Sequence, residues 1–92
     1  MAQLIIPTPL RKYTANNATF TTDSITIEQA IEELTNEYPE VKPHLLDASG
    51  RIRSFIKVFV GEDDIRSLNG EQTELKDSDV VSIVPAIAGG AV

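Results

Sequence analysis

The C-terminal residues 86–92, Ala-Ile-Ala-Gly-Gly-Ala-Val, have side chains that cannot act as acids, bases or metal ligands, yet their pattern suits another task. Gly89 and Gly90 have no Cβ, so a chain ending there can thread into a slot too narrow for any other residue. Residues 86–90 reach at most about 17 Å when extended. The pattern therefore predicts a tail that can extend away from the domain into a narrow slot.

Other kinds of reactive site find little support in the 92 residues. The chain has no Cys and one His, which excludes disulfides, thiolate metal ligands and a cysteine nucleophile. His44 alone cannot build a zinc site or a Ser–His pair, so we expect it on a surface or in a loop. The acids Glu62, Asp63, Asp64, Asp77 and Asp79 do not have the spacing of an EF-hand, and we interpret them as turn residues.

The charge balance also limits the partners. The chain has 8 Lys plus Arg and 14 Asp plus Glu, a net charge of −6, which argues against nucleic acid or an anionic membrane as the main partner. Its acids crowd one segment, at Glu28, Glu32, Glu33, Glu37 and Glu40. This segment is either a docking face for a basic partner or, more simply, a solvated helix face. Arg66, beside Asp64, either orients a partner or bonds locally.

No stretch approaches the roughly 18 apolar residues of a membrane helix. The N-terminal residues are apolar before they are basic, the reverse of a secretory signal. The sequence therefore predicts a cytoplasmic protein, with residues 1–92 forming a single domain and residues 86–92 a flexible tail.

The strands that must position this tail are predicted from runs of apolar and β-branched residues bounded by turn residues. We expect strands at 3–7, 18–22, 55–60 and 80–84, with a short strand at Ile65-Arg66. Segments 10–17, 40–54 and 67–74 are expected to be irregular. Phe20, Phe55 and Phe59 are expected in the core, although Phe59 and Ile83 could instead form an exposed docking patch on the sheet.

One helix is predicted between the second and third strands. Thr26 and Gln29 have the spacing of a capping box, and Pro39 should end the helix. Between them, apolar residues recur at helical spacing at Ile27, Ala30, Ile31, Leu34 and Tyr38. One main helix crossing a mixed sheet is an α+β arrangement, and the β-grasp (ubiquitin-like) fold is its commonest form at this length.

Residues 58–90 resemble the C-terminal half of the MoaD/ThiS family, the ubiquitin-like sulfur carriers that end in Gly-Gly. The similarity covers nearly the whole chain and is greatest to the CysO-type carriers of cysteine biosynthesis. It rests on the opening Ile6-Pro7-Thr8, the acidic turn Glu62-Asp63-Asp64-Ile65-Arg66, and the ending Val84-Pro85-Ala86-Ile87-Ala88-Gly89-Gly90. Molybdopterin-synthase small subunits usually have Pro-Pro-Val before the Gly-Gly.

The resemblance implies a carrier that is a protein co-substrate and not an enzyme, binding no cofactor of its own. A ThiF/MoeB-like activating enzyme would use ATP to adenylate Gly90, recognising the tail through Ala86, Ile87, Ala88 and Gly89. A sulfur donor would then give a thiocarboxylate. By resemblance, the acceptor is an activated serine on a pyridoxal-phosphate-dependent cysteine synthase.

The chain departs from the family pattern because Ala91 and Val92 follow Gly90. We expect a JAMM-type zinc metalloprotease to remove them, and the alternative is that they are a harmless extension. Three other functions stay open: the small subunit of molybdopterin synthase, a ubiquitin-like modifier or binding module without sulfur, and an unprocessed β-grasp interaction domain.

Overall fold

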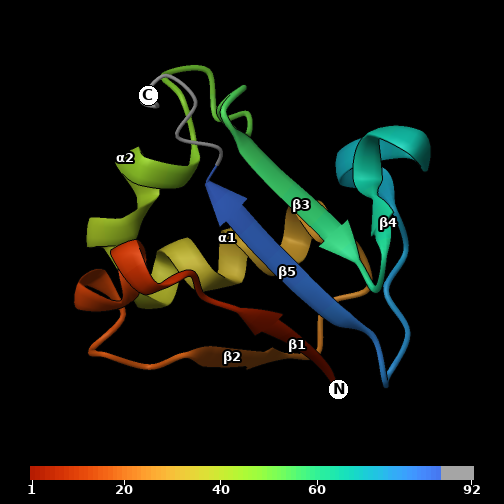
Figure 1. Cartoon of the computed structure of the whole chain (residues 1–92), viewed down its shortest axis with the longest axis horizontal. Helices are drawn as coiled ribbons and strands as arrows, with labels where there is room; N and C mark the ends of the chain where they lie inside the picture. The colour runs from red at the N-terminus through yellow and green to blue at the C-terminus, as the bar shows by residue number, and fades with distance from the viewer. Residues whose placement is uncertain (86–92) are drawn as a thin grey trace.

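The computed structural model describes residues 1–85, and a mixed five-stranded sheet is the centre of this part of the chain (Figure 1). The strands are β1 (Ala2–Ile5), β2 (Thr19–Thr22), β3 (Ile56–Val60), β4 (Asp63–Asp64) and β5 (Val80–Pro85). Their order across the sheet is β2-β1-β5-β3-β4, with β1 and β5 parallel and the other neighbours antiparallel. The last strand therefore lies in the middle of the sheet.

The helix α1 (Ile27–Glu37) begins and ends where the sequence predicts. The Thr26 side chain accepts a hydrogen bond from the Gln29 N–H at 3.2 Å. The Gln29 side chain accepts from the N–H of Ile25 at 3.4 Å, so the reciprocal half of the capping box reaches one residue further back than expected. The helix ends at Tyr38, directly before Pro39.

The Thr26 cap gives a direct stability test. Thr26→Ala removes the acceptor for a first-turn N–H, and we expect it to lower the free energy of unfolding by about 1 kcal/mol. Chemical denaturation of the variant and the parent measures this difference. Ser78→Ala, at an exposed turn position, is the control and should change stability by less than about 0.5 kcal/mol. Equal losses in the two variants would contradict the capping role.

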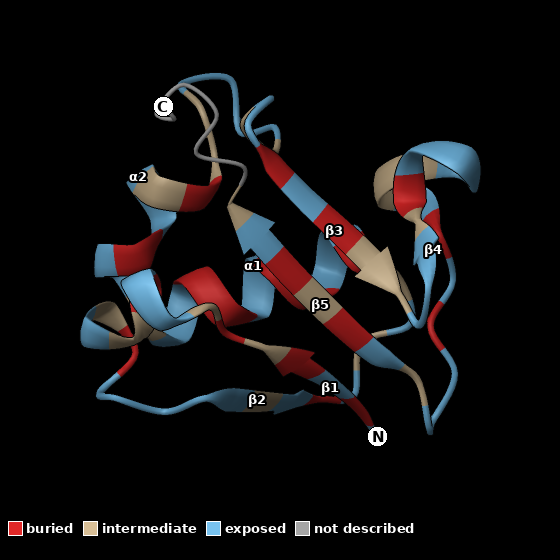
Figure 2. Ribbon diagram, viewed as in Figure 1, coloured by how far each residue is buried: buried red, intermediate tan, exposed pale blue. Residues whose placement is uncertain are grey.

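The core lies between α1 and one face of the sheet. Along β3 and β5, buried residues alternate with residues that face the opposite side (Figure 2). The helix contributes Ile27, Ala30, Ile31 and Leu34, each at most 4% exposed. The sheet contributes Leu4, Ile56, Val58, Val81 and Ile83. This arrangement is the predicted α+β, β-grasp architecture with one main crossing helix.

Short helices occupy two segments that were expected to be irregular. They are η1 (Thr8–Tyr13), η2 (Pro39–Val41) and α2 (Lys42–Leu45). Pro43 reads as a turn signal in the sequence, but it lies in the first turn of α2, where a missing N–H costs nothing. These elements are too short to produce a helical period, so the pattern could not reveal them.

The expected strand at Ile65-Arg66 is wrong. β4 is formed by the two residues before it, and Ile65 begins the short 3₁₀ helix η3 (Ile65–Ser67), which is followed by η4 (Gly70–Gln72). Asp64 accepts a hydrogen bond from the Arg66 N–H at 2.8 Å, and this cap turns the chain out of the sheet. Ile65 is buried from the helical turn and not from a strand.

Candidate functional site

The predicted tail residues Ala86, Ile87, Ala88, Gly89, Gly90, Ala91 and Val92 all lie outside the described residues. The structure therefore describes the base from which the tail leaves, which is the end of β5. Pro85 lies opposite Ile56 of β3, and Val84 lies opposite Lys57. β5 pairs with β1 over Val80–Ser82 and with β3 along its whole length, so the end of the strand is held by β3.

Buried side chains fix β5 against the helix side of the sheet. Val81 is fully buried and Ile83 is 3% exposed. The suggestion that Ile83 is an exposed docking position is therefore wrong. Val80 and Val84 on the same strand point to the other face of the sheet and are 43% and 42% exposed. Since both faces of β5 carry β-branched residues, the sequence alone could not assign them.

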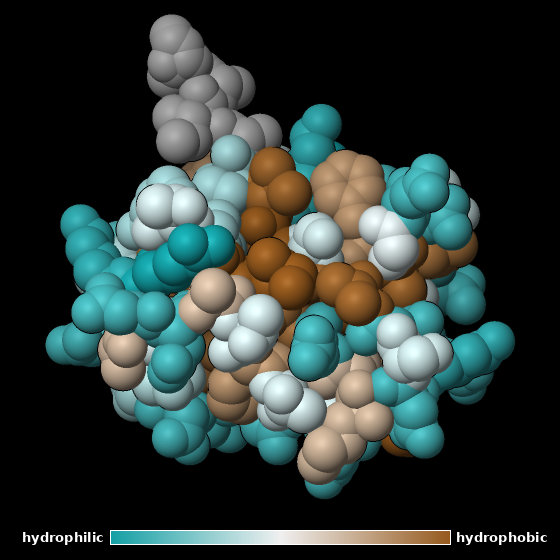
Figure 3. All heavy atoms as spheres, turned by 60° about the horizontal axis from the view of Figure 1, so that its bottom comes forward, coloured by the Kyte–Doolittle hydropathy of each residue, from teal (hydrophilic) through white to brown (hydrophobic). Residues whose placement is uncertain are grey.

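The face of the sheet opposite α1 carries apolar side chains that are exposed (Phe55, Val80 and Val84) or half-buried (Ile5 and Phe59), and we call these five residues the sheet patch. Figure 3 shows hydrophobic side chains gathered on this side of the molecule and bordered by hydrophilic ones. Phe55 was expected in the core, but it is 46% exposed. It directly precedes the buried Ile56 of β3, and successive side chains along a strand face opposite sides of the sheet. Exposed apolar clusters of this kind commonly mark protein-binding surfaces.

Three cationic side chains lie on the segments next to the end of β5. Lys57 is the cross-strand neighbour of Val84, and the Arg53 guanidinium lies 6.0 Å from the centre of the Phe55 ring. The Arg66 guanidinium donates to the Ser54 carbonyl at 3.1 Å. Arg66 thus bonds locally, which was one of its two expected roles.

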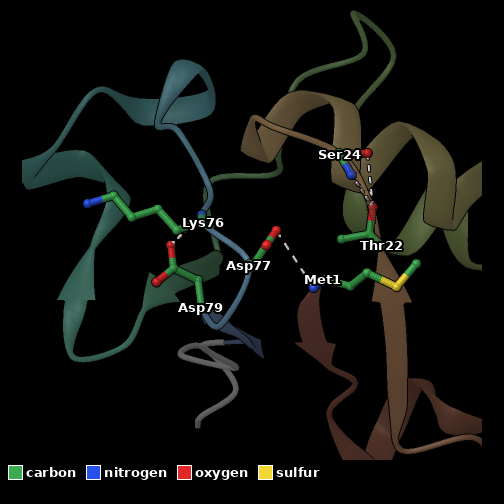
Figure 4. Close-up of polar contacts among 6 residues, drawn as sticks. All are labelled: Met1, Thr22, Ser24, Lys76, Asp77 and Asp79. Atoms are coloured by element: carbon green, nitrogen blue, oxygen red, sulfur yellow. Dashed lines mark hydrogen bonds and ion pairs between the residues drawn. The ribbon is translucent and has the colours of Figure 1, made fainter.

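The turn before β5 is tied to the N-terminus (Figure 4). The Met1 ammonium lies 3.8 Å from the Asp77 carboxylate, and the Lys76 N–H donates to Asp79 at 2.8 Å. The same view shows the Thr22 hydroxyl in contact with Ser24, between β2 and α1. The first set lies where β1 begins and the second where β2 ends.

His44 and the acidic residues form no metal site among residues 1–85. The His44 ring stacks on Tyr13, with ring centres 4.2 Å apart. Within residues 1–85, no group of three or more His, Asp or Glu side chains is arranged to hold a metal ion. The same residues contain no helix long and apolar enough to cross a membrane.

Asp47 organises the loop that follows α2. Its carboxylate accepts from the Ser49 hydroxyl at 2.7 Å and from the N–H groups of Ser49 and Arg51. The Ser49 hydroxyl, followed by the Arg51 N–H, lowers the pKa of Asp47 below its ordinary value. A lowered pKa means that these contacts stabilise the loop above the ordinary Asp range and are lost as the pH falls through the pKa of the folded state.

Comparison with known proteins places this geometry in a family. Residues 4–90 match the ThiS family. The chain belongs to the ThiS family. A curated relative, the sulfur carrier protein CysO of Mycobacterium tuberculosis, is 33% identical over 92% of this chain and 94% of its own. A putative sulfur carrier protein of Archaeoglobus fulgidus is 34% identical over 74% of this chain and 77% of its own.

Solved structures agree with this placement. The structure of the Amycolatopsis orientalis BexX/CysO complex contains a chain that matches 98% of this one and is itself fully covered, with a TM-score of 0.87 and 30% identity. By sequence and fold, this ThiS-family protein is a small ubiquitin-like sulfur carrier of the CysO, ThiS and MoaD type. The predicted family is confirmed, whereas the roles of Gly90 and the other tail residues stay predictions.

Proposed function

We propose that this protein carries sulfide as a thiocarboxylate on Gly90, exposed by removal of Ala91 and Val92. The observation that carries the proposal is the extent of the family match, which ends at Gly90 and leaves the last two residues outside it. The position of β5 supports it, because a central strand gives the tail a rigid base.

The proposed chemistry needs only the terminal carboxylate from this chain. A carboxylate oxygen of Gly90 attacks the α-phosphorus of ATP on the activating enzyme, and pyrophosphate leaves. A sulfide equivalent from the sulfur donor then forms a C–S bond at the acyl carbon, and AMP leaves with the oxygen. The thiocarboxylate sulfur finally attacks an electrophile and displaces its leaving group, and hydrolysis of the acyl bond frees the sulfur-containing product and returns the Gly90 carboxylate. The carrier contributes no acid, base or metal to any of these steps. The dependence on ATP fits a cytoplasmic location.

A chain that ends at Val92 cannot enter this cycle in the proposed form. Its terminal carboxylate belongs to Val92, whose isopropyl group would clash with a slot shaped for glycine. We therefore assign a precursor role to residues 91–92, with a JAMM-type zinc metalloprotease as the enzyme that removes them.

The activating enzyme, of the ThiF/MoeB type, is proposed to bind the sheet patch. This surface lies on β5 itself, and Val84 is one residue from the end of the strand, so binding there brings the tail close to the bound enzyme. The basic side chains Arg53 and Lys57 add a charge that an acidic border of the enzyme would complement.

The proposed sulfur acceptor is an activated serine on a pyridoxal-phosphate-dependent cysteine synthase. The similarity to carriers named CysO favours this acceptor over the molybdopterin precursor that the small subunit of molybdopterin synthase serves. A ubiquitin-like modifier without sulfur chemistry is the remaining alternative.

Intact-mass measurement tests the proposal. Chains ending at Gly90 and at Val92 are each incubated with a ThiF/MoeB-type enzyme, ATP and a sulfide source. We expect the chain ending at Gly90 to gain the mass difference between sulfur and oxygen, and the chain ending at Val92 to stay unchanged. Loss of the dipeptide in lysate of the native host should make the longer chain competent. An unchanged mass for the shorter chain would favour the modifier or binding-module function.

A further inference from the structure

The chain between η3 and η4 contains Asn69 followed by Gly70, and this is the one Asn-Gly pair in the sequence. The two residues can react with each other, because the side-chain carbonyl carbon of an asparagine comes within reach of the backbone nitrogen that follows it. Glycine has no Cβ to hinder this approach. Asn69 is exposed, and a Cβ built on Gly70, where φ is +60°, would have no atom within 4 Å. Water can therefore reach the pair.

Neither reacting group of this pair is engaged elsewhere in the described part of the chain. Within residues 1–85, the Asn69 side chain makes no hydrogen bond, and the Gly70 N–H donates to no backbone or side-chain acceptor. A hydrogen bond to either group would have to be broken before the nitrogen could attack. Asn69 and Gly70 can therefore react without that cost.

The other three asparagines are each held by a hydrogen bond. The N–H that follows Asn16 donates to the Thr14 carbonyl at 2.9 Å, and the Asn17 side chain donates to the Tyr38 hydroxyl at 3.0 Å. Asn36 lies within α1, where the following N–H bonds to the carbonyl four residues earlier. Within residues 1–85, the fold thus distinguishes Asn69 from the other asparagines.

We propose that Asn69 is a site of spontaneous modification, converted to aspartate and isoaspartate through a cyclic imide with Gly70. The Gly70 nitrogen attacks the side-chain carbonyl carbon of Asn69 and forms a C–N bond, and the side-chain amide leaves as ammonia with the proton of the Gly70 N–H. Water then opens the ring. Opening at the side-chain carbonyl gives aspartate with a normal backbone, and opening at the backbone carbonyl gives isoaspartate. Water is the only other reactant, and the inference does not depend on the sulfur chemistry.

The reacting pair lies in a segment that supports the start of α1. The Asn69 N–H donates to the Thr73 hydroxyl at 3.1 Å, and this hydroxyl donates to the Gly70 carbonyl at 2.7 Å. Thr73 is 6% exposed, and its carbonyl accepts from the N–H of Ile27, the first residue of α1, at 3.0 Å. Isoaspartate adds a carbon to the backbone between positions 69 and 70, which moves the Asn69 N–H relative to Thr73. Isoaspartate should therefore loosen the first turn of α1, whereas aspartate should not.

Peptide mapping by mass spectrometry tests the site in the full-length folded protein, kept in warm neutral buffer for several weeks. We expect Asn69 to gain the mass difference between a hydroxyl and an amino group, while Asn17 and Asn36 stay unchanged. The peptide Ser-Leu-Asn-Gly-Glu, which copies residues 67–71, gives the rate without the fold, and Asn69 in the protein should convert within about tenfold of it. A slower conversion of Asn69, or equal rates at Asn69 and Asn36, would overturn the proposal.

Two variants at position 69 separate the reaction from its consequence. Asn69→Gln must close a larger ring and should convert at least about tenfold more slowly. Asn69→Asp has the added charge with a normal backbone. Amide exchange at Ile27, followed by NMR, should be about tenfold faster in the isoaspartate form of the parent, separated by chromatography, and should change less than about twofold in Asn69→Asp. Exchange that is the same in the isoaspartate form and the unmodified protein would contradict the loosening of α1.

Discussion

In a chain that ends at Gly90, replacing this residue by alanine will lower the rate of adenylation by about a hundredfold or more. The added methyl group would lie beside the reacting carboxylate, in a part of the enzyme that must be narrow enough to select glycine. A misplacement of about 1 Å at a reacting group is enough for a loss of this size. Pyrophosphate release with the activating enzyme and ATP measures the rate.

The control for Gly90→Ala is a change at Ala88, two residues before the reacting group. Ala88→Ser adds one atom to the same tail and should lower the rate much less, since it lies away from the carboxylate. Thermal unfolding of both variants should match the parent, because the described core, from Ala2 to Ile83, is unchanged in both. A folding defect in Gly90→Ala would mean that the glycine has a structural role, and an unchanged rate would contradict the proposed site.

The sequence predicted the parts of the fold whose signals are long enough to be periodic. α1 has a cap, an apolar stripe and a proline stop, and it lies where expected. The strands β1, β2, β3 and β5 were each found within two residues at either end. The turn η3 was mistaken for a strand because Ile65 is buried in either case, and a single buried residue does not distinguish them.

Of the candidate site, the glycine pair could be predicted from the sequence and the sheet patch could not. Gly89 and Gly90 stand out in the sequence because their lack of side chains is unusual after a strand, and no packing argument is needed to find them. The sheet patch depends on which way β5 faces, and Val80, Val81, Ile83 and Val84 are too alike to decide it. Which side chains of β5 face the helix is fixed by the register of its pairing with β1 and β3. These contacts are long-range, so a local sequence pattern does not contain them.

A groove beside α1, made of two hollows that share Glu28, Gly50 and Glu71, could not have been predicted from the sequence. Its walls come from α1, the loop after α2 and the segment 65–72, which are distant in sequence and separated by turns that the pattern left irregular. The acids of α1 were visible, and the simplest interpretation was a solvated face. The structure adds that Glu28 and Glu32 line the smaller hollow, together with Lys42.

Val84→Asp is expected to reduce kcat/KM for activation by about a hundredfold, mainly through KM. Val84 lies one residue before the end of β5 and is 42% exposed on the sheet patch. A carboxylate there would have to lose its water when the enzyme covers the patch, and this cost opposes binding without touching the reacting group. Steady-state kinetics with a saturating ATP concentration separate the KM effect from any effect on kcat.

Ile25→Asp is the matched control for Val84→Asp. Ile25 is also an exposed apolar residue, at 63%, but it precedes α1 and lies outside the sheet patch. Both variants should remain folded, and Asp at position 84 would face Lys57 across the strands, a favourable pairing. A loss of activation only in Val84→Asp would locate the docking surface on the sheet. Equal losses would show that added negative charge acts over the whole molecule, and no loss in either would place the enzyme on another face.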